Sequence, residues 1–225
     1  MHLVVFGSTG FLAQEITQMM SGKGWRISQF SSSSTENGVL SFENSKWPEL
    51  LLEKGTVDGV VWAQGKNGQG TVLTTSKDDM VSLFEANVVY VSESLKALHS
   101  KKTLSNPCRA VILSSVWQEV SRPEKFAYSV SKSAISGLVR SMAVDMAAEG
   151  FSVNAVLPGV VDSPMAHAQL TSSSIKALRD KTPGGQLVSQ QNVASIVSFL
   201  LSSDSTGING QSLTVDNGWS MVHLV

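Results

Sequence analysis

Short apolar runs alternate along this chain with longer segments in which apolar residues recur at helical spacing. The runs predict strands at 2–6, 25–30, 39–43, 57–62, 109–114, 152–157 and 211–215. The longer segments predict helices at 10–21, 46–54, 77–103, 127–149 and 190–202, with a shorter one around 164–180. Strands that alternate with helices are typical of an α/β fold with a parallel sheet and helices on both faces. We therefore predict a doubly wound sheet of about seven strands.

The connection between the second and third predicted strands is short and polar. Residues 31–38 read Ser-Ser-Ser-Ser-Thr-Glu-Asn-Gly. A crossover between parallel strands normally takes a dozen or more residues, so a full helix is not expected here. We predict that one face of the sheet is less covered in this half. The serine run at 31–34 has two interpretations, a solvated loop or a hydroxyl-lined pocket.

The composition fits one domain, residues 1–225, and narrows the range of functions. The chain has 17 basic and 18 acidic residues, a balance that does not indicate a nucleic-acid-binding surface. Its one cysteine, Cys108, excludes an intrachain disulfide. No apolar run approaches the ~20 residues of a membrane helix, and the first run lacks the basic residues of a signal peptide. We expect a cytoplasmic protein with no membrane and no nucleic-acid partner.

The segment 115–132 carries the residues with the most specific chemistry. Tyr128 and Lys132 are four apart, so a helix places them on one face. A free tyrosine titrates near ~10, and a cation within a few ångströms lowers its pKa. Ser115 adds a hydroxyl at the end of an apolar run, whereas Ser114 should point to the other side of that strand. These groups together can protonate a carbonyl oxygen, although a Tyr–Lys pair alone is also an ordinary surface pair.

The first apolar run leads into a loop with the spacing G-x-x-G-x-x-A. Small residues here let the backbone turn sharply and approach a pyrophosphate, which the following helix binds with its N-terminal amides. A strand–helix turn with two glycines is a weak signal by itself, and its position directly after an apolar run strengthens it. The candidate cofactor-binding residues of this loop are Gly7, Ser8, Thr9, Gly10, Phe11 and Leu12.

Taken together, these motifs resemble those of the short-chain dehydrogenase/reductase family. Ser115, Tyr128 and Lys132 match its catalytic serine, tyrosine and lysine, including the spacing of thirteen between serine and tyrosine. Asn87 matches the asparagine that completes the family's catalytic tetrad. Residues 153–165 and 207–218 resemble two further family segments, the strand and Pro-Gly turn beside the nicotinamide and the last strand. The resemblance covers nearly the whole chain and implies a Rossmann-type fold.

The resemblance also implies a mechanism. Tyr128 would be the general acid for ketone reduction and the base for alcohol oxidation, in an NAD(P)-dependent dehydrogenase or reductase. Lys132 would lower the pKa of Tyr128 and hold the nicotinamide ribose, and Ser115 would bind the substrate oxygen. Asn87 would link Lys132 to solvent through its backbone carbonyl and a water. Two alternatives stay open: a nucleotide-binding scaffold or sensor without turnover, and net non-redox chemistry such as epimerisation.

Further cofactor contacts are implied at three other strand ends. Pro158, Gly159, Val161 and Ser163 are expected to flank the nicotinamide, with Ser163 where relatives use threonine. The chain reads Trp-Ala-Gln-Gly at 62–65 where relatives usually carry Asn-Asn-Ala-Gly. This departure leaves Ala63, Gln64 and Gly65 as candidates, against the simpler interpretation of a repacked strand end.

The choice between NADP and NAD depends on the end of the second strand. NAD enzymes often place a carboxylate there, which binds the ribose hydroxyls and repels a 2′-phosphate. Here Ser31 and Ser32 occupy those positions, Glu36 follows several residues later, and no arginine or lysine stands ready for a phosphate except Lys23 or Arg26. The sequence favours NADP and leaves NAD open.

The substrate and the assembly are less well specified. A small carbonyl or alcohol substrate is expected between residues 116–127 and a lid at 163–186. Arg122 and Lys125, near the entrance of this site, could contact an anion, although a solvated position is favoured for both. The helices at 77–103 and 127–149 carry apolar residues on more than one face, for example Phe84 and Val144, which indicates a homodimer or homotetramer.

Overall fold

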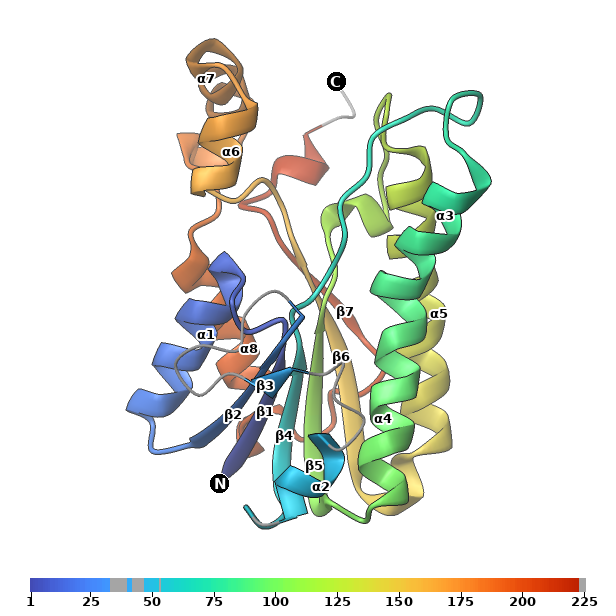
Figure 1. Ribbon diagram of the computed structural model, residues 1–225. Helices are drawn as coiled ribbons and strands as arrows, with labels where there is room; N and C mark the ends of the chain where they lie inside the picture. Colours follow the sequence, from blue (N-terminus) through green and yellow to red (C-terminus); the bar gives the residue numbers. More distant parts are fainter. Residues whose placement is uncertain (33–39, 42–46, 53, 223–225) are drawn as a thin grey trace.

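The protein, described by a computed structural model for residues 1–32, 40–41, 47–52 and 54–222, is built on one parallel sheet (Figure 1). The seven strands follow the order β3-β2-β1-β4-β5-β6-β7, so the prediction of a doubly wound α/β fold is confirmed. Six strands have four residues or more, and β3 is a two-residue edge strand. The strands are β1 His2–Phe6, β2 Arg26–Ser31, β3 Leu40–Ser41, β4 Val57–Trp62, β5 Leu104–Leu113, β6 Phe151–Pro158 and β7 Ser212–Val215.

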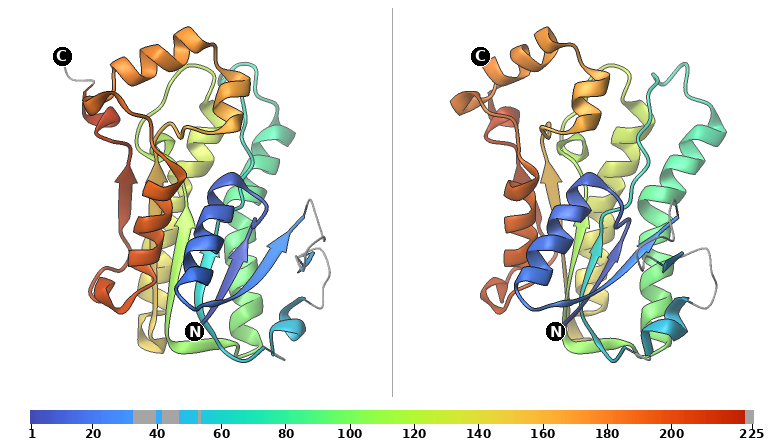
Figure 2. Two further views of the ribbon diagram at one scale, coloured as in Figure 1. Left: turned by 90° about the vertical axis from the view of Figure 1, so that its left-hand side faces the viewer. Right: turned by 60° about the vertical axis from the view of Figure 1, so that its left-hand side comes forward.

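Helices cover both faces of the sheet, because the inner strands are apolar on both sides. Along β1, Leu3 and Val5 pack with one group of helices, whereas Val4 and Phe6 pack with the other. The first group is α1 Phe11–Gly22 and α8 Gln190–Leu200; the second is α3 Lys77–Phe84, α4 Tyr90–Ser100 and α5 Phe126–Asp145, with α2 Trp47–Leu52 (Figures 1 and 2). The short helices α6 Pro164–Gln169 and α7 Ser172–Asp180 stand above the carboxyl ends of the strands.

The helix predicted over 77–103 is present over 77–100 and contains a π-helical turn. This turn, Glu85–Val89, separates α3 from α4. Such turns widen a helix locally and occur often at functional sites. The segment predicted as one short helix around 164–180 forms two helices, α6 and α7, because Leu170 between them has an extended backbone. The fifth strand begins at Leu104, earlier than predicted, and pairs with β4 through an irregular register near Gly59.

The short connection after β2 agrees with its prediction where the structure describes it. Phe30 pairs with Leu40 and Ser31 with Ser41, so the chain returns to the sheet within residues 32–39. On the α1 side of β2, Ile27 and Gln29 are only half-buried, which agrees with a thinner cover on that face. Residues 33–39, including Glu36 and most of the serine run, lie outside the described residues, as do 42–43 of the third predicted strand.

Candidate active site

A cavity of about 290 Å³ opens at the carboxyl ends of the strands, where β1 and β4 lie side by side. The chain leaves β1 and β4 toward opposite sides of the sheet here, and open α/β sheets bind ligands at such a point. We call this space the first cavity. Its lining residues are Gly10, Phe11, Leu12, Ala13, Ala63, Gln64, Gly65, Lys66, Asn67, Leu113, Ser114, Tyr128, Lys132, Val161 and Ser163.

Tyr128 lies between a hydroxyl and an ammonium group. Its phenol is hydrogen-bonded to Ser115, which follows β5, and Lys132 lies one turn further along α5. The Lys132 ammonium is 5.8 Å from the centre of the Tyr128 ring. Burial raises the pKa of Tyr128 above its ordinary value, and the hydrogen bond from Ser115 opposes this. The three residues therefore meet at the wall of the first cavity, with the phenol protonated at neutral pH in the free protein.

Lys132 is a buried cation. Only 3% of the residue is exposed, and its Nζ donates to the carbonyl oxygen of Leu113 at 3.2 Å. Burial lowers its pKa from 10.5 to about 8, because water no longer stabilises the charge. Gly65 makes room for it, since a Cβ at that position would stand 3.4 Å from Nζ and 3.2 Å from Asn87 Oδ1.

Asn87 sits in the π turn and fixes the loop that borders the cavity. Its Oδ1 accepts from the Lys66 amide at 2.8 Å, and its Nδ2 donates to the Lys66 carbonyl at 3.0 Å and to Ser131 Oγ at 2.9 Å. The side chain therefore joins the loop after β4 to α5. Asn87 lies behind Gly65 and does not itself line the first cavity.

The glycine-containing loop after β1 lies very close to the backbone of the loop after β4. Gly7 has φ +75, and a Cβ there would lie 2.4 Å from the backbone nitrogen of Gln64. The amides of Gly7 and Ser8 both donate to the carbonyl of Phe30 and so are not available to a ligand. Gly10 is the N-cap of α1 and provides no side-chain cap, and Phe11 and Leu12 of the first helical turn line the cavity.

Two buried polar atoms at this cavity have no hydrogen-bond partner among the described residues. They are Gln64 Oε1 and Ser114 Oγ. No acidic residue lines the first cavity, whereas Lys66 and Lys132 do. Orphaned polar atoms, an uncapped helix N-terminus and an excess of positive charge fit a ligand with hydroxyl and phosphate groups, so the site fits a dinucleotide.

Of the other predicted cofactor residues, Ser163 lines this cavity, whereas Thr9, Ser31, Ser32, Pro158 and Gly159 do not. Thr9 and Ser31 hydrogen-bond each other through their hydroxyls at 3.0 Å, and Ser32 lines a separate hollow beside Gln64 and Lys66. Ser163 caps α6 by accepting from Ala166, while also lining the cavity. Pro158 ends β6, and Gly159 follows it against Asp216, whose Cβ would lie 2.7 Å from a Cβ at Gly159.

A second cavity of about 420 Å³ adjoins the first. The two share Asn67, Val161 and Ser163, and the second is also lined by residues of α6 and α7, which lie within the segment 163–186 where a lid is predicted. We call it the second cavity. Its lining residues are Asn67, Trp117, Arg122, Lys125, Gly159, Val160, Val161, Ser163, Ala166, Leu170, Ser174, Leu178 and Trp219.

The prediction that Lys125 is solvated is wrong, because the residue is only 5% exposed. The loop after β4 crosses over it: the amide of Gly70 donates to the Glu124 carbonyl, and the amide of Phe126 donates to the Gly70 carbonyl. Arg122 is exposed as predicted.

Sequence reasoning missed several residues at the two cavities. They are Ala13, Lys66, Asn67, Leu113 and Ser114. Ser114 is expected on the other side of the strand, away from the site, yet it lines the first cavity. Lys66 and Asn67 belong to an irregular loop without a periodic pattern.

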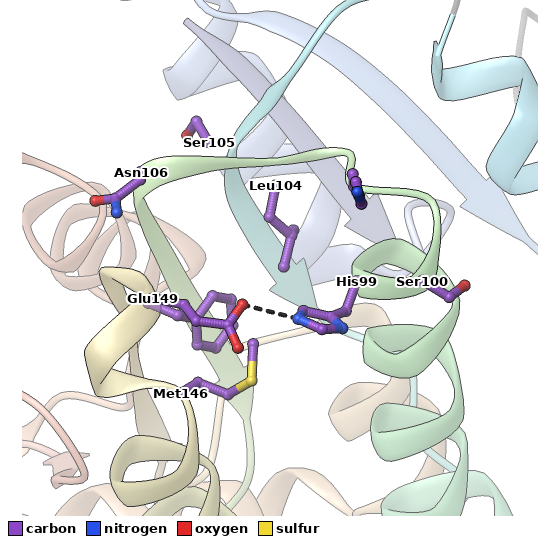
Figure 3. A pocket seen from close by; sticks show the side chains of 9 residues that line it. His99, Ser100, Leu104, Ser105, Asn106, Met146 and Glu149 are labelled. Atoms are coloured by element: carbon purple, nitrogen blue, oxygen red, sulfur yellow. Dashed lines mark hydrogen bonds and ion pairs between the residues drawn. The ribbon is translucent and has the colours of Figure 1, made fainter.

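Another cavity, of about 400 Å³, lies at the opposite end of the strands, where β5 and β6 begin (Figure 3). His99 at the end of α4 and Glu149 after α5 approach each other across it, with a hydrogen bond of 2.8 Å. Leu104 lines this cavity at the start of β5, whereas Leu113 at the other end of β5 lines the first cavity. This third space is therefore remote from Tyr128. None of the site residues predicted from the sequence lines it.

Comparisons with known proteins agree with this geometry. A model of the family described as "Enoyl-(Acyl carrier protein) reductase" matches residues 48–220. An uncharacterized oxidoreductase, YmfI of Bacillus subtilis, is 30% identical over 167 residues, which cover 72% of this chain and 67% of that protein. The chain belongs to the short-chain dehydrogenase/reductase family.

Named relatives of this short-chain dehydrogenase/reductase act on different compounds. Cyclopentanol dehydrogenase of Comamonas sp. is 30% identical over 172 residues, covering 76% of this chain and 69% of the relative. A 3-oxoacyl-[acyl-carrier-protein] reductase of Salmonella typhimurium is 27% identical over 173 residues, covering 77% and 70%. These relatives indicate an oxidoreductase with a small-molecule substrate.

Solved structures show the same fold. Aldohexose dehydrogenase of Thermoplasma acidophilum superposes with a TM-score of 0.88 at 22% identity, covering 100% of this chain and 95% of that one. In the described part of this chain, no helix is long and apolar enough to cross a membrane. Nor do the described residues contain a group of three or more histidine, cysteine or acidic side chains that could hold a metal ion.

Proposed function

We propose that this protein is an NAD(P)-dependent oxidoreductase that interconverts a carbonyl compound and its alcohol, with Tyr128 as the general acid and base. The observation that carries the proposal is the position of Tyr128. Its phenol is bonded to Ser115, and Lys132 lies beside it on the same helix, at a cavity with positive charge and unpartnered polar atoms. A second cavity for a substrate adjoins it.

The cofactor, when bound, supplies or accepts the hydride. The helix amides at Phe11 and Leu12 would hold its pyrophosphate, and Gln64 and Ser114 have free polar atoms for its hydroxyl or amide groups. Gly7, Ser8, Thr9 and Gly10 would shape the turn beneath it. Val161, Ser163 and Gly159 would border the nicotinamide, after Pro158.

The residues of this chain would then move the proton. Ser115 and Tyr128 bind the substrate oxygen, and Tyr128 gives its phenol proton to that oxygen as the carbon is reduced. The resulting phenolate would be stabilised by the Lys132 ammonium and reprotonated from solvent. In the opposite direction, the phenolate would take the proton of the alcohol.

Asn87 would complete the proton path through its backbone carbonyl and a water. Hydrogen bonds in a π turn run from residue i to residue i−5, as the Tyr90 amide does to Glu85, so carbonyls in the turn are rearranged. Asn87 lies in this turn beside the Lys132 ammonium, with Gly65 between them. This placement supports a relay from Lys132 to solvent.

We further propose NADP as the preferred cofactor, with NAD as the alternative. Ser31 and Ser32 end β2 without a carboxylate, and Ser31 is bonded to Thr9 of the turn. Nothing acidic among the described residues at this strand end would repel a 2′-phosphate.

The decisive experiment measures NADPH and NADH oxidation against a panel of ketones and aldehydes. The panel includes an enoyl thioester and a 3-oxoacyl thioester, because the matching family model and one relative carry those activities in their descriptions. Tyr128→Phe keeps the ring and removes the transferable proton, so turnover should fall at least about 10²-fold while the cofactor still binds. Tyr90→Phe is the matched control, because Tyr90 is the only other tyrosine and packs against Phe6 away from the first cavity.

The alternatives give different results. A scaffold or sensor would bind NADPH, turn over no carbonyl, and be insensitive to Tyr128→Phe. An epimerase would change the configuration of a hydroxyl group without net consumption of the cofactor. Unchanged turnover in Tyr128→Phe would remove Tyr128 from the mechanism.

We also propose that residues 1–225 act as one cytoplasmic unit that assembles as a homodimer or homotetramer. The supporting feature is a set of exposed apolar side chains on α3, the π turn and α5. They are Met80, Val81, Phe84, Val89, Val130 and Val144.

A further inference from the structure

Tyr128 has a second lysine beside it, on the side away from Lys132. Lys125 lies three residues before Tyr128, at the N-cap of α5, and Lys132 lies four residues after it, so all three share one helix face. The two ammonium groups are 5.2 Å and 5.8 Å from the centre of the Tyr128 ring. They serve different spaces, since Lys132 lines the first cavity and Lys125 lines the second.

Lys125 is buried with neutral partners only. Its Nζ donates to Asn67 Oδ1 at 2.7 Å and to the Gly68 carbonyl at 3.2 Å. None of the ion pairs among the described residues involves it, and no acidic residue lines the second cavity. A buried ammonium without a counter-charge is costly, so an anion that enters this cavity gains a charge-assisted hydrogen bond and compensates Lys125.

The rest of the second cavity suits an organic anion. The Arg122 guanidinium lies 5.8 Å from the centre of the Trp117 ring, and Trp117 packs edge-to-face with Trp219 at 5.7 Å. Arg122 is thus a second cation at the second cavity, stabilised by a cation–π contact with Trp117. Val160, Ala166, Leu170 and Leu178 add apolar side chains to the wall, which also includes Ser163 and Ser174.

We propose that the substrate of this enzyme is an oxo acid, or the corresponding hydroxy acid, whose carboxylate binds Lys125 and Arg122 while its carbonyl meets Tyr128 and Ser115. This inference rests on the proposed function and adds the substrate class. A carboxylate fits because it is planar, carries one charge and accepts hydrogen bonds from both cations. The carbon chain between the two groups would lie against the apolar side chains of the wall and the tryptophan pair.

Lys125 has a competing role as a structural clamp for the loop 66–70. Under that explanation its removal would affect every substrate equally, because the loop also carries Lys66 and Asn67 of the first cavity. A substrate anion predicts a different pattern, a loss confined to substrates that carry a carboxylate. The comparison of charged and neutral substrates therefore separates the two roles.

The test compares linear oxo acids, with one to four carbons between carbonyl and carboxylate, with their methyl esters. Wild type should reduce at least one acid with a kcat/KM about 10- to 100-fold above its ester. Lys125→Met should raise KM for that acid about 10- to 100-fold, as expected for the loss of a buried hydrogen bond to a charged group, and leave its ester within about threefold. Lys125→Arg should recover part of the loss, Arg122→Gln should have a smaller effect, and Lys96→Met is the surface control.

A second measurement needs no turnover. Binding of the same oxo acids is followed by intrinsic fluorescence, because Trp117 and Trp219 line the cavity. Binding that Lys125→Met abolishes supports the carboxylate site, even where no acid is reduced and the proposed reaction itself fails. If the enzyme reduces neutral ketones, and reduces oxo acids and their esters with equal kcat/KM, the inference is overturned and the proposed function stands. Equal losses for acid and ester in Lys125→Met, or no binding of any acid, would also overturn it.

Discussion

Replacement of Lys132 should harm activity and yet stabilise the free protein at neutral pH. Lys132→Met keeps an unbranched side chain, one atom shorter, and removes its charge. The Lys132 ammonium is buried, has one hydrogen bond, to the Leu113 carbonyl, and has a pKa lowered from 10.5 to about 8. Turnover and cofactor affinity should both fall, turnover by at least about 10²-fold, because the residue serves the phenolate and the ribose.

The gain in stability follows from the lowered pKa. A shift of 2.5 units, from 10.5 to about 8, corresponds to about 3 kcal/mol in favour of the neutral form. At pH 7 Lys132 is charged in both the folded and the unfolded protein, so nearly all of this free energy destabilises the folded state. Loss of the hydrogen bond to the Leu113 carbonyl should lower the free energy of unfolding by about 1 kcal/mol. The net increase for Lys132→Met is then about 2 kcal/mol.

The pH dependence gives the sharper test. The unfolded chain binds more protons than the folded one between pH 8 and 10.5, so the contribution of Lys132 to wild-type stability rises with pH in this window. At pH 10 the remaining cost is about 1 kcal/mol, and the advantage of Lys132→Met should nearly vanish.

Urea unfolding followed by circular dichroism, at pH 7 and pH 10 and one protein concentration, measures both differences. Lys96→Met is the control for net charge, because the Lys96 side chain is 72% exposed. The reasoning is refuted by a variant that is less stable than wild type at pH 7. A stability difference that is the same at both pH values would also refute it.

Three further predictions concern the cofactor, the turn and the assembly. NADPH should bind at least as tightly as NADH in a fluorescence titration, and a clear preference for NADH would mean that a carboxylate reaches the ribose. Gly7→Ala should lose about 2–4 kcal/mol of stability in urea and most cofactor affinity, because of its φ of +75 and the 2.4 Å approach to Gln64. Gly22→Ala should lose neither stability nor cofactor affinity, because a Cβ at Gly22 would have nothing within 4 Å. Equal effects of the two substitutions would contradict the steric argument. Sedimentation should give the mass of a dimer or tetramer that Val144→Asp weakens and Leu73→Asp does not; these side chains are 78% and 90% exposed. A single-chain mass for wild type would refute the oligomer.

Prediction from the sequence succeeded where chemistry depends on local spacing. Tyr128 and Lys132 meet because a helix brings residues four apart together, and Ser115 reaches them from the end of a buried strand. The prediction of an α/β fold required only strands that alternate with helices. The π turn within the helix over 77–100 has no local sequence pattern, and its Asn87 bonds to Lys66 and Ser131, which are distant in the sequence.

The sequence by itself determined the α/β fold, the family and the Ser–Tyr–Lys group, since periodicity and fixed spacings carry that information. Only the tertiary structure decided which charges are buried. Lys125 lies in a polar stretch, beside Glu124 and after Arg122, and any local pattern predicts a solvated side chain. It is buried because the loop around Gly70 crosses the start of α5 and places Asn67 and Gly68 over its ammonium. Such burial depends on contacts between residues more than fifty positions apart, and no local pattern in the chain records them.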